Sequence, residues 1–466
     1  MKGLQAIGIT IATAEATLVE PVDFHLQPGQ PLTLLGETGS GKSLLAQAVM
    51  GILPETLQAS GTLIINGQRY QLPQDRDALR SLWGRTMASL PQEPWLALDP
   101  TMAIQQQVAE GYQYIRGHSA PQSMAAAQDD LTQLGLQAAA QKFPWQLSGG
   151  MAQRAAFAAA RAGGAEILIA DEPTKGLDVS RRDDVSALLR REVAEGGTLL
   201  TITHDIALAR QLGGDVIVMH KGKVIEQGSA QQVLHTPQQR YTRELLAADP
   251  AAWPQRQSTV IRSKPVVSAQ GIKLQRGGNT LGVPENFTLH AGEIVGLHGA
   301  SGSGKSSFGD VLLGLLAPQQ GSITRHVAAS ALKYQKIYQD PSALFPPTRT
   351  LSQSLEDVLC RHRIERSKRD SLMEQLALDP SLLTRCPDSL SGGELQRFSL
   401  LRVMLLEPVF LFADEPTSRL DPLVQQQTLQ LITQMARQQQ CGVLLVSHDR
   451  ELLEKGTDRV IAMQAA

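Results

Sequence analysis

Two short stretches of the sequence have the residue types and the spacing of a loop that binds phosphate groups. They run from Gly36 to Ser43 and from Gly299 to Ser306, and both read Gly-x-x-x-x-Gly-Lys-Ser. Glycines in such a loop let successive backbone N–H groups point at phosphate oxygens, and the N-terminus of a following helix adds positive charge. The pattern therefore predicts two sites for the phosphates of a nucleotide, called P-loops below.

Every position of the two P-loops is a predicted contact of the nucleotide. The first loop contributes Gly36, Glu37, Thr38, Gly39, Ser40, Gly41, Lys42 and Ser43, and the second contributes Gly299, Ala300, Ser301, Gly302, Ser303, Gly304, Lys305 and Ser306. We expect each lysine to reach the β- and γ-phosphates, and the serine that follows it to bind Mg²⁺ through its hydroxyl group.

An acidic pair after an apolar run supplies the second half of each site. The segments are ILIADE at 167–172 and LFADE at 411–415. A buried strand of this kind would present Asp171 or Asp414 to Mg²⁺ at its carboxyl end. The adjacent Glu172 and Glu415 are then placed to activate the attacking water as general bases. An acidic pair alone is more often a solvated strand end, but the two P-loops favour the catalytic interpretation.

The elements that must position these residues occur twice in the same order. LSGGMAQR at 147–154 returns as LSGGELQR at 390–397, and TITHD at 201–205 returns as LVSHD at 445–449. The first serine of each LSGG segment lies 24 residues before the glutamate of its acidic pair, which is the constant distance of a helix followed by a strand. The chain is therefore a tandem duplication. Between the P-loop and the next shared motif, the second copy is shorter by most of a strand-and-turn segment.

The same repeat predicts the domain organisation and the fold class. Residues 249–265 are polar, contain three prolines and show no helical or strand periodicity, so they are expected to link a domain at 1–248 to a domain at 266–466. Domain 1 ends in a short helical appendage. Short apolar runs without alternation favour strands buried on both faces, and hence an α/β fold with a mainly parallel sheet in each of two tandem P-loop NTPase domains. The stretches after Lys2 and at 266–275 are expected to be their first strands.

Composition excludes several classes of protein. The 466 residues include 43 Lys+Arg and 45 Asp+Glu, a net charge of −2 that gives no basic field for nucleic acid. Hydrophobic residues make up 42% and charged residues 19%, as in globular proteins. Three distant cysteines argue against a disulfide framework or a zinc site. No apolar run is long enough to span a bilayer, which favours a cytoplasmic protein.

The LSGG segments, each shortly before an acidic pair, are the signature of ABC-transporter ATPases, and the sequence resembles two such nucleotide-binding domains fused in one chain. The resemblance implies ATP as the bound nucleotide, with hydrolysis at both sites and a helical subdomain that carries each signature. It also implies intramolecular head-to-tail pairing of the two domains. The P-loop of domain 1 would then face Ser391, and the P-loop of domain 2 would face Ser148.

Further site residues follow from the family by motif position. The resemblance implies that His204 and His448 are switch histidines, which hold the γ-phosphate and the catalytic glutamate. It implies that Gln92 and Gln339 are Q-loop residues, which link Mg²⁺ and water to the membrane-facing subdomain. The remaining nucleotide contacts that it implies are the signature residues Ser148, Gly149, Gly150, Ser391, Gly392 and Gly393, and the D-loop residues Asp178 and Asp421.

Two segments are similar to the oligopeptide/dipeptide/nickel uptake group of this family: PQQRYTRELL at 237–246 and EPWLALDP at 93–100. This likeness implies an importer of peptides, nickel or metal chelates, with two separate integral-membrane permease subunits and an extracytoplasmic substrate-binding protein. The chain would lie peripherally on the cytoplasmic face of the inner membrane, without a nucleic-acid partner. We also expect the 90–100 segment to dock the permeases through exposed Trp95 and Leu98.

Two alternatives to the peptide or nickel importer have to be weighed, and one feature of the sequence argues against each. A soluble twin-ABC ATPase that acts on ribosomes would carry a long, charged helical linker, whereas the linker here is short and rich in proline. The fused ATPase of another importer, such as a sugar system, usually has a degraded second catalytic set, and here both sets are complete.

Overall fold

A computed structural model describes residues 2–90, 94–174, 179–255, 263–276, 279–300, 302–327, 330–418 and 420–463. The chain divides into two compact units, Met1–Leu246 and Ala247–Ala466, called unit 1 and unit 2. Within those ranges, no helix combines the length and the apolar character that a membrane span requires.

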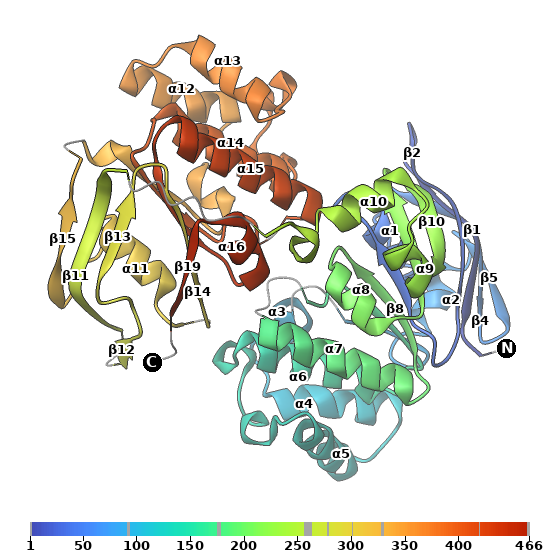
Figure 1. Ribbon diagram of the computed structural model, residues 1–466. Coiled ribbons are helices and arrows are strands. Elements are labelled where there is room, and N and C mark those ends of the chain that lie inside the picture. The colour runs from blue at the N-terminus through green and yellow to red at the C-terminus, as the bar shows by residue number, and fades with distance from the viewer. Residues whose placement is uncertain are drawn as a thin grey trace. The chain divides into compact units, whose positions relative to one another are not determined.

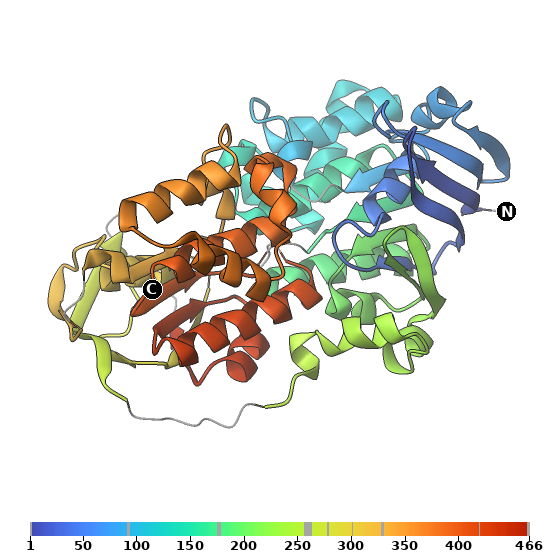
Figure 2. The ribbon, with the colours of Figure 1, turned by 90° about the horizontal axis from the view of Figure 1, so that it is seen from above.

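Unit 1 contains two sheets (Figure 1). One is a six-stranded sheet in the order β10-β9-β3-β8-β7-β6, in which every pair is parallel except β10 with β9. The other is antiparallel, in the order β2-β1-β4-β5, and Figure 2 shows its strands side by side in blue. The strands are β1 Leu4–Ala12, β2 Thr17–Leu26, β3 Leu32–Leu35, β4 Gln58–Ile65, β5 Gln68–Leu72, β6 Met87–Leu90, β7 Ile167–Asp171, β8 Thr198–Thr203, β9 Asp215–His220 and β10 Lys223–Ser229.

The helices of unit 1 fall into two groups. Helix α1 lies between the two sheets, whereas α4, α5 and α6 pack on one another as a helical subdomain (Figure 1). The helices are α1 Lys42–Met50, α2 Arg76–Arg80, α3 Pro94–Ala97, α4 Ile104–Glu110, α5 Ala120–Gln133, α6 Gly149–Ala162, α7 Val179–Ala194, α8 Ile206–Leu212, α9 Ala230–His235 and α10 Arg240–Ala247, with the shorter turns η1 Gly111–Ile115, η2 Gln137–Ala139 and η3 Pro144–Gln146.

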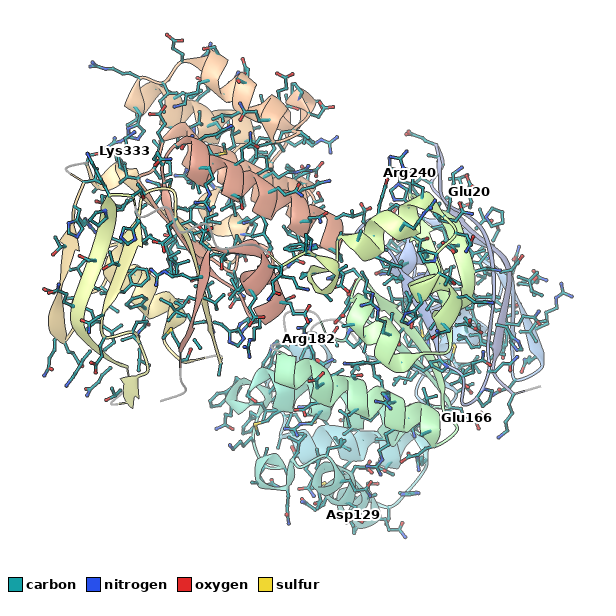
Figure 3. All side chains as sticks on the ribbon, viewed as in Figure 1. Glu20, Asp129, Glu166, Arg182, Arg240 and Lys333 are labelled. Carbon is teal, nitrogen blue, oxygen red and sulfur yellow. The ribbon has the colours of Figure 1, made fainter. Side chains whose placement is uncertain are left out.

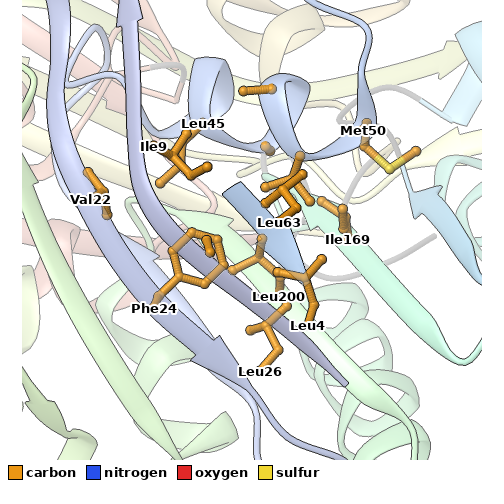
Figure 4. Packing of buried hydrophobic residues seen from close by; sticks show 14 of the residues in the cluster. Leu4, Ile9, Val22, Phe24, Leu26, Leu45, Met50, Leu63, Ile169 and Leu200 are labelled. Atoms are coloured by element: carbon orange, nitrogen blue, oxygen red, sulfur yellow. The ribbon is translucent and has the colours of Figure 1, made fainter. Parts of the chain in front are cut away.

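The main core of unit 1 fills the space between its two sheets. Figure 4 shows Leu4, Ile9 and Phe24 of the antiparallel sheet packed near Leu45 of α1 and Leu200 of β8. Because α1 is buried from both sides, its first residue and the loop before it have little freedom to move. The core therefore holds the first P-loop against the carboxyl end of β3.

Unit 2 repeats this plan with fewer strands. A parallel sheet has the order β16-β17-β18-β14-β19, and an antiparallel sheet joins β12, β11 and β13, with β15 also paired to β11. The strands are β11 Pro265–Arg276, β12 Asn279–Leu281, β13 Phe287–His290, β14 Ile294–Gly299, β15 Gln320–Arg325, β16 Tyr334–Ile337, β17 Phe410–Asp414, β18 Gly442–Val446 and β19 Arg459–Met463.

The helices of unit 2 correspond in order to those of unit 1. Helix α11 begins at Lys305, within the second P-loop, and α12 and α13 pack near α14 (Figure 1). The helices are α11 Lys305–Leu312, α12 Leu351–His362, α13 Arg366–Gln375, α14 Gly392–Leu405, α15 Pro422–Gln438 and α16 Arg450–Gly456, with the turns η4 Pro250–Ala252, η5 Ala331–Lys333, η6 Pro341–Leu344, η7 Pro380–Thr384 and η8 Pro387–Ser389.

The predicted fold class is confirmed, with one addition. Each unit has the expected parallel sheet and helical subdomain, and β1 and β11 are the expected first strands. The antiparallel sheets were not predicted. The segment missing from the second copy is also visible, because unit 1 has β4, β5 and α2 between its P-loop helix and β6, whereas the described part of unit 2 has β15 and η5 there.

Candidate functional site

Sheet order brings the predicted site residues of each unit to one edge. In unit 1, β8 lies between β3, which leads into the P-loop, and β7, which ends at Asp171. In unit 2, β18 lies in the same way between β14 and β17. Because the carboxyl ends of parallel strands meet at one edge, the P-loop, the acidic pair and the histidine segment converge there.

The first P-loop wraps around the ammonium group of Lys42. This side chain is buried, and its Nζ donates hydrogen bonds to the carbonyl oxygens of Gly36 at 2.8 Å and Glu37 at 2.7 Å and to Ser40 Oγ at 3.2 Å. Gly41, with φ 99°, precedes α1 in a left-handed conformation that disfavours other residues. A concave loop with a fixed cation suits phosphate oxygens.

The second P-loop has the same construction. Lys305 is buried, and its Nζ donates to the carbonyl oxygens of Gly299 at 2.8 Å and Ala300 at 2.9 Å. Gly304 precedes α11 with φ 101°. Among the predicted contacts of this loop, Ser301 lies outside the described residues.

A serine hydroxyl and a carboxylate meet beside each P-loop. Ser43 Oγ lies 3.2 Å from Asp171 Oδ1, and Ser306 Oγ lies 3.2 Å from Asp414 Oδ1. Hydroxyl and carboxylate oxygens are the ligands that Mg²⁺ prefers, and these pairs stand at the start of the helix that follows the P-loop. The residues present therefore fit the predicted metal.

In unit 1 the predicted general base is held by the end of β8. Glu172 Oε1 lies 2.9 Å from His204 Nδ1, and Glu172 Oε2 accepts hydrogen bonds from Thr203 Oγ1 at 3.2 Å and from the backbone N–H of His204 at 3.4 Å. Thr203 is a contact that no motif predicts, although it precedes the histidine in the shared segment. These bonds fix the direction of a buried carboxylate.

In unit 2 the corresponding glutamate has different partners. Glu415 Oε1 lies 2.7 Å from His448 Nε2, and Glu415 Oε2 accepts a hydrogen bond of 3.0 Å from Gln339 Nε2. The structure thus brings together three predicted residues at this site. Gln92, the counterpart of Gln339, lies outside the described residues.

Both glutamates have left-handed backbone conformations, with φ 48° at Glu172 and φ 50° at Glu415. Such conformations are costly for residues other than glycine, and they persist only where the surrounding structure enforces them. The hydrogen bond from each glutamate N–H to the adjacent strand, to Ile202 O or Val446 O, provides this restraint.

The signature segments begin the helices α6 and α14. Ser148 and Ser391 are N-caps, whose Oγ atoms accept from the N–H groups of Met151 at 3.4 Å and Glu394 at 3.3 Å. The glycine pairs Gly149–Gly150 and Gly392–Gly393 form the first helical positions. Each signature therefore presents backbone N–H groups at a helix N-terminus, where an anion is favoured.

The predicted D-loop residues are only partly described. Asp178 lies outside the described residues. Asp421 is buried and caps α15, with Oδ1 accepting from Val424 N at 3.1 Å.

Unit 2 has a charged cluster that the motifs did not predict. Lys336 Nζ lies 2.7 Å from Asp310 Oδ1 and 3.7 Å from Asp414 Oδ2. Burial raises the pKa of Asp414, and so does the neighbouring Glu415, whereas the hydrogen bond from Ser306 and the charge of Lys336 oppose this shift. No spacing rule predicts a lysine three positions before the Q-loop glutamine.

In unit 1 the helical appendage reaches the P-loop through two rings. The Tyr241 ring, on α10, lies 4.1 Å from the His220 ring, centroid to centroid. His220 Nδ1 in turn lies 3.8 Å from Glu37 Oε1 in the P-loop. The sequence predicts the appendage but not this contact.

Of the two apolar residues expected to be exposed in the segment at 90–100, only one is exposed. Trp95 is 41% exposed, but Leu98 is 4% exposed and packs in the core of the helical subdomain. The prediction that Leu98 is exposed was therefore wrong, because this residue, directly after α3, packs inward.

Comparison with known proteins identifies the class that this fold and site define. The family model described as ABC transporter matches residues 19–175 and 284–418, one match in each unit. The chain belongs to the ABC transporter family, as an ATP-binding protein with two nucleotide-binding domains.

Relatives match almost the whole chain. It is 32% identical to the peptidoglycan transport ATP-binding protein YejF of Agrobacterium fabrum, over 97% of this chain and 88% of the relative. It is 33% identical to the glutathione import ATP-binding protein GsiA of Salmonella typhi, over 96% of this chain and 81% of the relative.

Among solved structures, one named RNase-L Inhibitor resembles the chain with a TM-score of 0.67 and 19% identity, covering 97% of this chain and 87% of that one. At this identity the likeness concerns the fold, and it supports the twin-domain architecture.

Proposed function

We propose that this chain is the ATP-hydrolysing subunit of a bacterial importer for peptides or peptide-containing molecules. The observation that carries the proposal is the sequence similarity of nearly the full chain to ATP-binding proteins named for peptidoglycan transport and glutathione import. Both of those cargoes contain peptide portions, so the peptide side of the predicted uptake group is favoured over nickel.

The chemistry proposed for each site follows from its geometry. Lys42 and Lys305 bind the phosphates, and Ser43 with Asp171, or Ser306 with Asp414, would hold Mg²⁺. The metal, when bound, neutralises charge on the phosphate oxygens. Each buried glutamate accepts a proton from the attacking water, and the histidine beside it keeps the carboxylate directed at that water.

Assembly is proposed on the same basis. Two permease subunits would receive the chain at the cytoplasmic face of the membrane, and an extracytoplasmic binding protein would deliver the cargo. Within the chain, head-to-tail pairing would place the signature of one unit over the nucleotide of the other. The complete set of motifs in each unit supports two hydrolysing sites.

The test uses a tagged chain with Glu172→Gln and Glu415→Gln, which should bind ATP without hydrolysing it and hold the ATP-bound assembly. We expect purification from detergent-solubilised cells with ATP, followed by mass spectrometry, to recover two permeases. A chain with Lys42→Ala and Lys305→Ala, which removes the phosphate-binding ammonium groups, is the matched control and should recover less of both. Recovery of ribosomal proteins in place of permeases would overturn the proposal.

The cargo is tested on the same assembly, purified with the unmodified, hydrolysing chain and placed in lipid vesicles. Its ATP hydrolysis should rise when the binding protein is loaded with short peptides and should not respond to nickel salts. Stimulation by nickel alone would move the function to the metal side of the uptake group.

A further inference from the structure

The two P-loop sites differ in the residue that the neighbouring strand places beside the carboxylate proposed to hold the metal. In unit 2, Lys336 on β16 directs its ammonium group at Asp414, with Nζ 3.7 Å from Oδ2. The opposite oxygen of the same carboxylate, Oδ1, lies 3.2 Å from Ser306 Oγ. One carboxylate therefore has the P-loop serine on one side and a fixed cation on the other.

The position of this cation is determined by its surroundings. Asp310 on α11 binds Lys336 Nζ at 2.7 Å, and the ammonium group lies 5.0 Å from the centre of the Phe412 ring and 5.1 Å from that of Tyr338. The side chains of Lys336 and Asp414 are each only 12% exposed. In such a place water and salt screen charges weakly. The carboxylate of Asp310 offsets part of the charge of Lys336, but Lys336 lowers the pKa of Asp414 more than Asp310 raises it.

Unit 1 lacks both members of this pair. Its strand register gives the correspondence, because Ser89 pairs with Ile169 two positions before Asp171, as Lys336 pairs with Phe412 two positions before Asp414. The helix position that matches Asp310, five residues after the P-loop lysine, is Gln47. Ser89 itself is exposed.

From this asymmetry we propose that Lys336 is a positioning residue, which acts through Asp414 to make nucleotide binding at the second P-loop less dependent on Mg²⁺ than binding at the first. A fixed ammonium group beside Asp414 repels an arriving divalent cation and offsets part of the repulsion between that carboxylate and the phosphates. ATP without Mg²⁺ then binds more tightly at the second site than at the first, and addition of Mg²⁺ improves ATP binding less at the second site. By linkage, the same factor reduces the effect of ATP on metal affinity.

The experiment compares the two sites in the full-length purified chain. Lys42→Ala leaves the second P-loop as the measured site, and Lys305→Ala leaves the first. The dissociation constant of a fluorescent trinitrophenyl derivative of ATP is determined with excess MgCl₂ and with EDTA. We define the magnesium ratio as the dissociation constant in EDTA divided by the dissociation constant in MgCl₂. We expect this ratio to be about tenfold smaller at the second site than at the first.

Exchange of the charged pair is the decisive variant. Asp310→Gln with Lys336→Ser gives unit 2 the residues of unit 1 and should raise its magnesium ratio, while Gln47→Asp with Ser89→Lys should lower the ratio in unit 1. A purely structural ion pair would change the melting temperature without moving the ratio between the sites. Lys336→Met, which keeps the stem of the side chain, serves if the exchanged unit 2 does not fold.

Equal magnesium ratios at the two sites, or ratios unaffected by the exchange, would overturn the inference. It rests on the proposed function only through nucleotide binding at both P-loops. Because binding is measured without permeases or cargo, a wrong cargo assignment leaves the result intact, whereas loss of all nucleotide binding would count against the ATPase itself.

Discussion

His204 Nδ1 lies 2.9 Å from Glu172 Oε1, and both side chains are largely buried beneath the P-loop edge of the sheet. A neutral imidazole has one donor and one acceptor nitrogen, and the nitrogen facing an ionised carboxylate is the donor. In unit 2 the facing atom is Nε2 of His448, at 2.7 Å from Glu415 Oε1. The two rings therefore present different nitrogens away from their glutamates, although the residues correspond in sequence.

Glu172→Gln is expected to remove hydrolysis at the first site while keeping ATP bound. The amide preserves the shape of the side chain but cannot accept a proton from water. If the sites contribute equally, phosphate release by the full chain should fall by about half, and addition of Glu415→Gln should lower it by about two to three orders of magnitude.

The matched control is Glu20→Gln, which changes a surface carboxylate that is 49% exposed and labelled in Figure 3. It should leave phosphate release at the level of the unmodified chain. Unchanged turnover in the Glu172→Gln chain, with ATP still bound, would show that the first site is not catalytic.

Much of the fold could be predicted because its signals are local and repeated. Glycine spacing predicted a helix at the end of each P-loop, where α1 and α11 begin, and unbroken apolar runs indicated β7 and β17. The antiparallel sheet of unit 1 is built from two local hairpins, β1 with β2 and β4 with β5, which are joined by a pairing across a long separation, as when Leu4 of β1 meets Ile65 of β4. Such a pairing leaves little trace in either segment alone.

The candidate site was predictable only where motifs have fixed spacing. Sheet order brings Ser43 to Asp171 across 128 residues, and the motifs of the two segments anticipate that meeting. No motif contains Lys336, and the segment at 237–246 that contains Tyr241 indicates a likeness to the uptake group but no contact with the P-loop. The contacts of both residues depend on which elements lie side by side. Burial also decides cases that composition cannot, since Trp95 and Leu98 differ tenfold in exposure within one short turn.

Tyr241→Ala should weaken ATP binding at the first P-loop. The substitution removes the ring that packs on His220, and His220 faces Glu37 of the loop at 3.8 Å. We expect a loss of about 2 kcal/mol in the stability of unit 1, together with a several-fold increase in the dissociation constant for ATP in the Lys305→Ala chain.

Two variants separate the ring contact from general destabilisation. Tyr241→Phe retains the ring and should bind ATP normally. Leu245→Ala opens a cavity at a fully buried position of the same helix, so it should lower stability with little effect on ATP affinity. Equal affinity losses in the Tyr241→Ala and Leu245→Ala chains would argue against a specific link to the P-loop.

A cysteine at position 95 should form cross-links with a permease in the assembled transporter. Trp95 is 41% exposed, so Trp95→Cys places a thiol on the surface, whereas Leu98→Cys places it in the core and is the matched control. In both chains Cys360 and Cys386 are replaced by serine, so that their thiols cannot react. Cys441 is retained, because it is buried and burial raises the pKa of its thiol. Absence of adducts from position 95 would count against docking by this segment.

Glu293 in unit 2 forms a buried charged network. Its Oε1 lies 2.7 Å from Arg459 Nε, and its Oε2 accepts from the backbone N–H of His290 at 2.8 Å. Burial by itself raises the pKa of Glu293, but the hydrogen bonds from Arg459 and His290 outweigh it and leave the pKa below its usual value. The ionised form is therefore the one that the folded state stabilises.

Stability from this network should be present at neutral pH and lost in acid. A carboxyl group with a depressed folded-state pKa contributes fully above its unfolded pKa of about 4.3, and the contribution disappears as the pH falls through the folded-state pKa. Glu293→Gln should therefore cost about 2 kcal/mol at pH 7, and progressively less below pH 4, in calorimetric unfolding followed against pH. Glu407→Gln, at a carboxylate that is 56% exposed and paired with Lys368, is the control and should cost less than about 1 kcal/mol. A deficit of the Glu293→Gln chain that stays constant from neutral to acid pH would assign the loss to packing, because only the ionised carboxylate gives the effect a pH dependence.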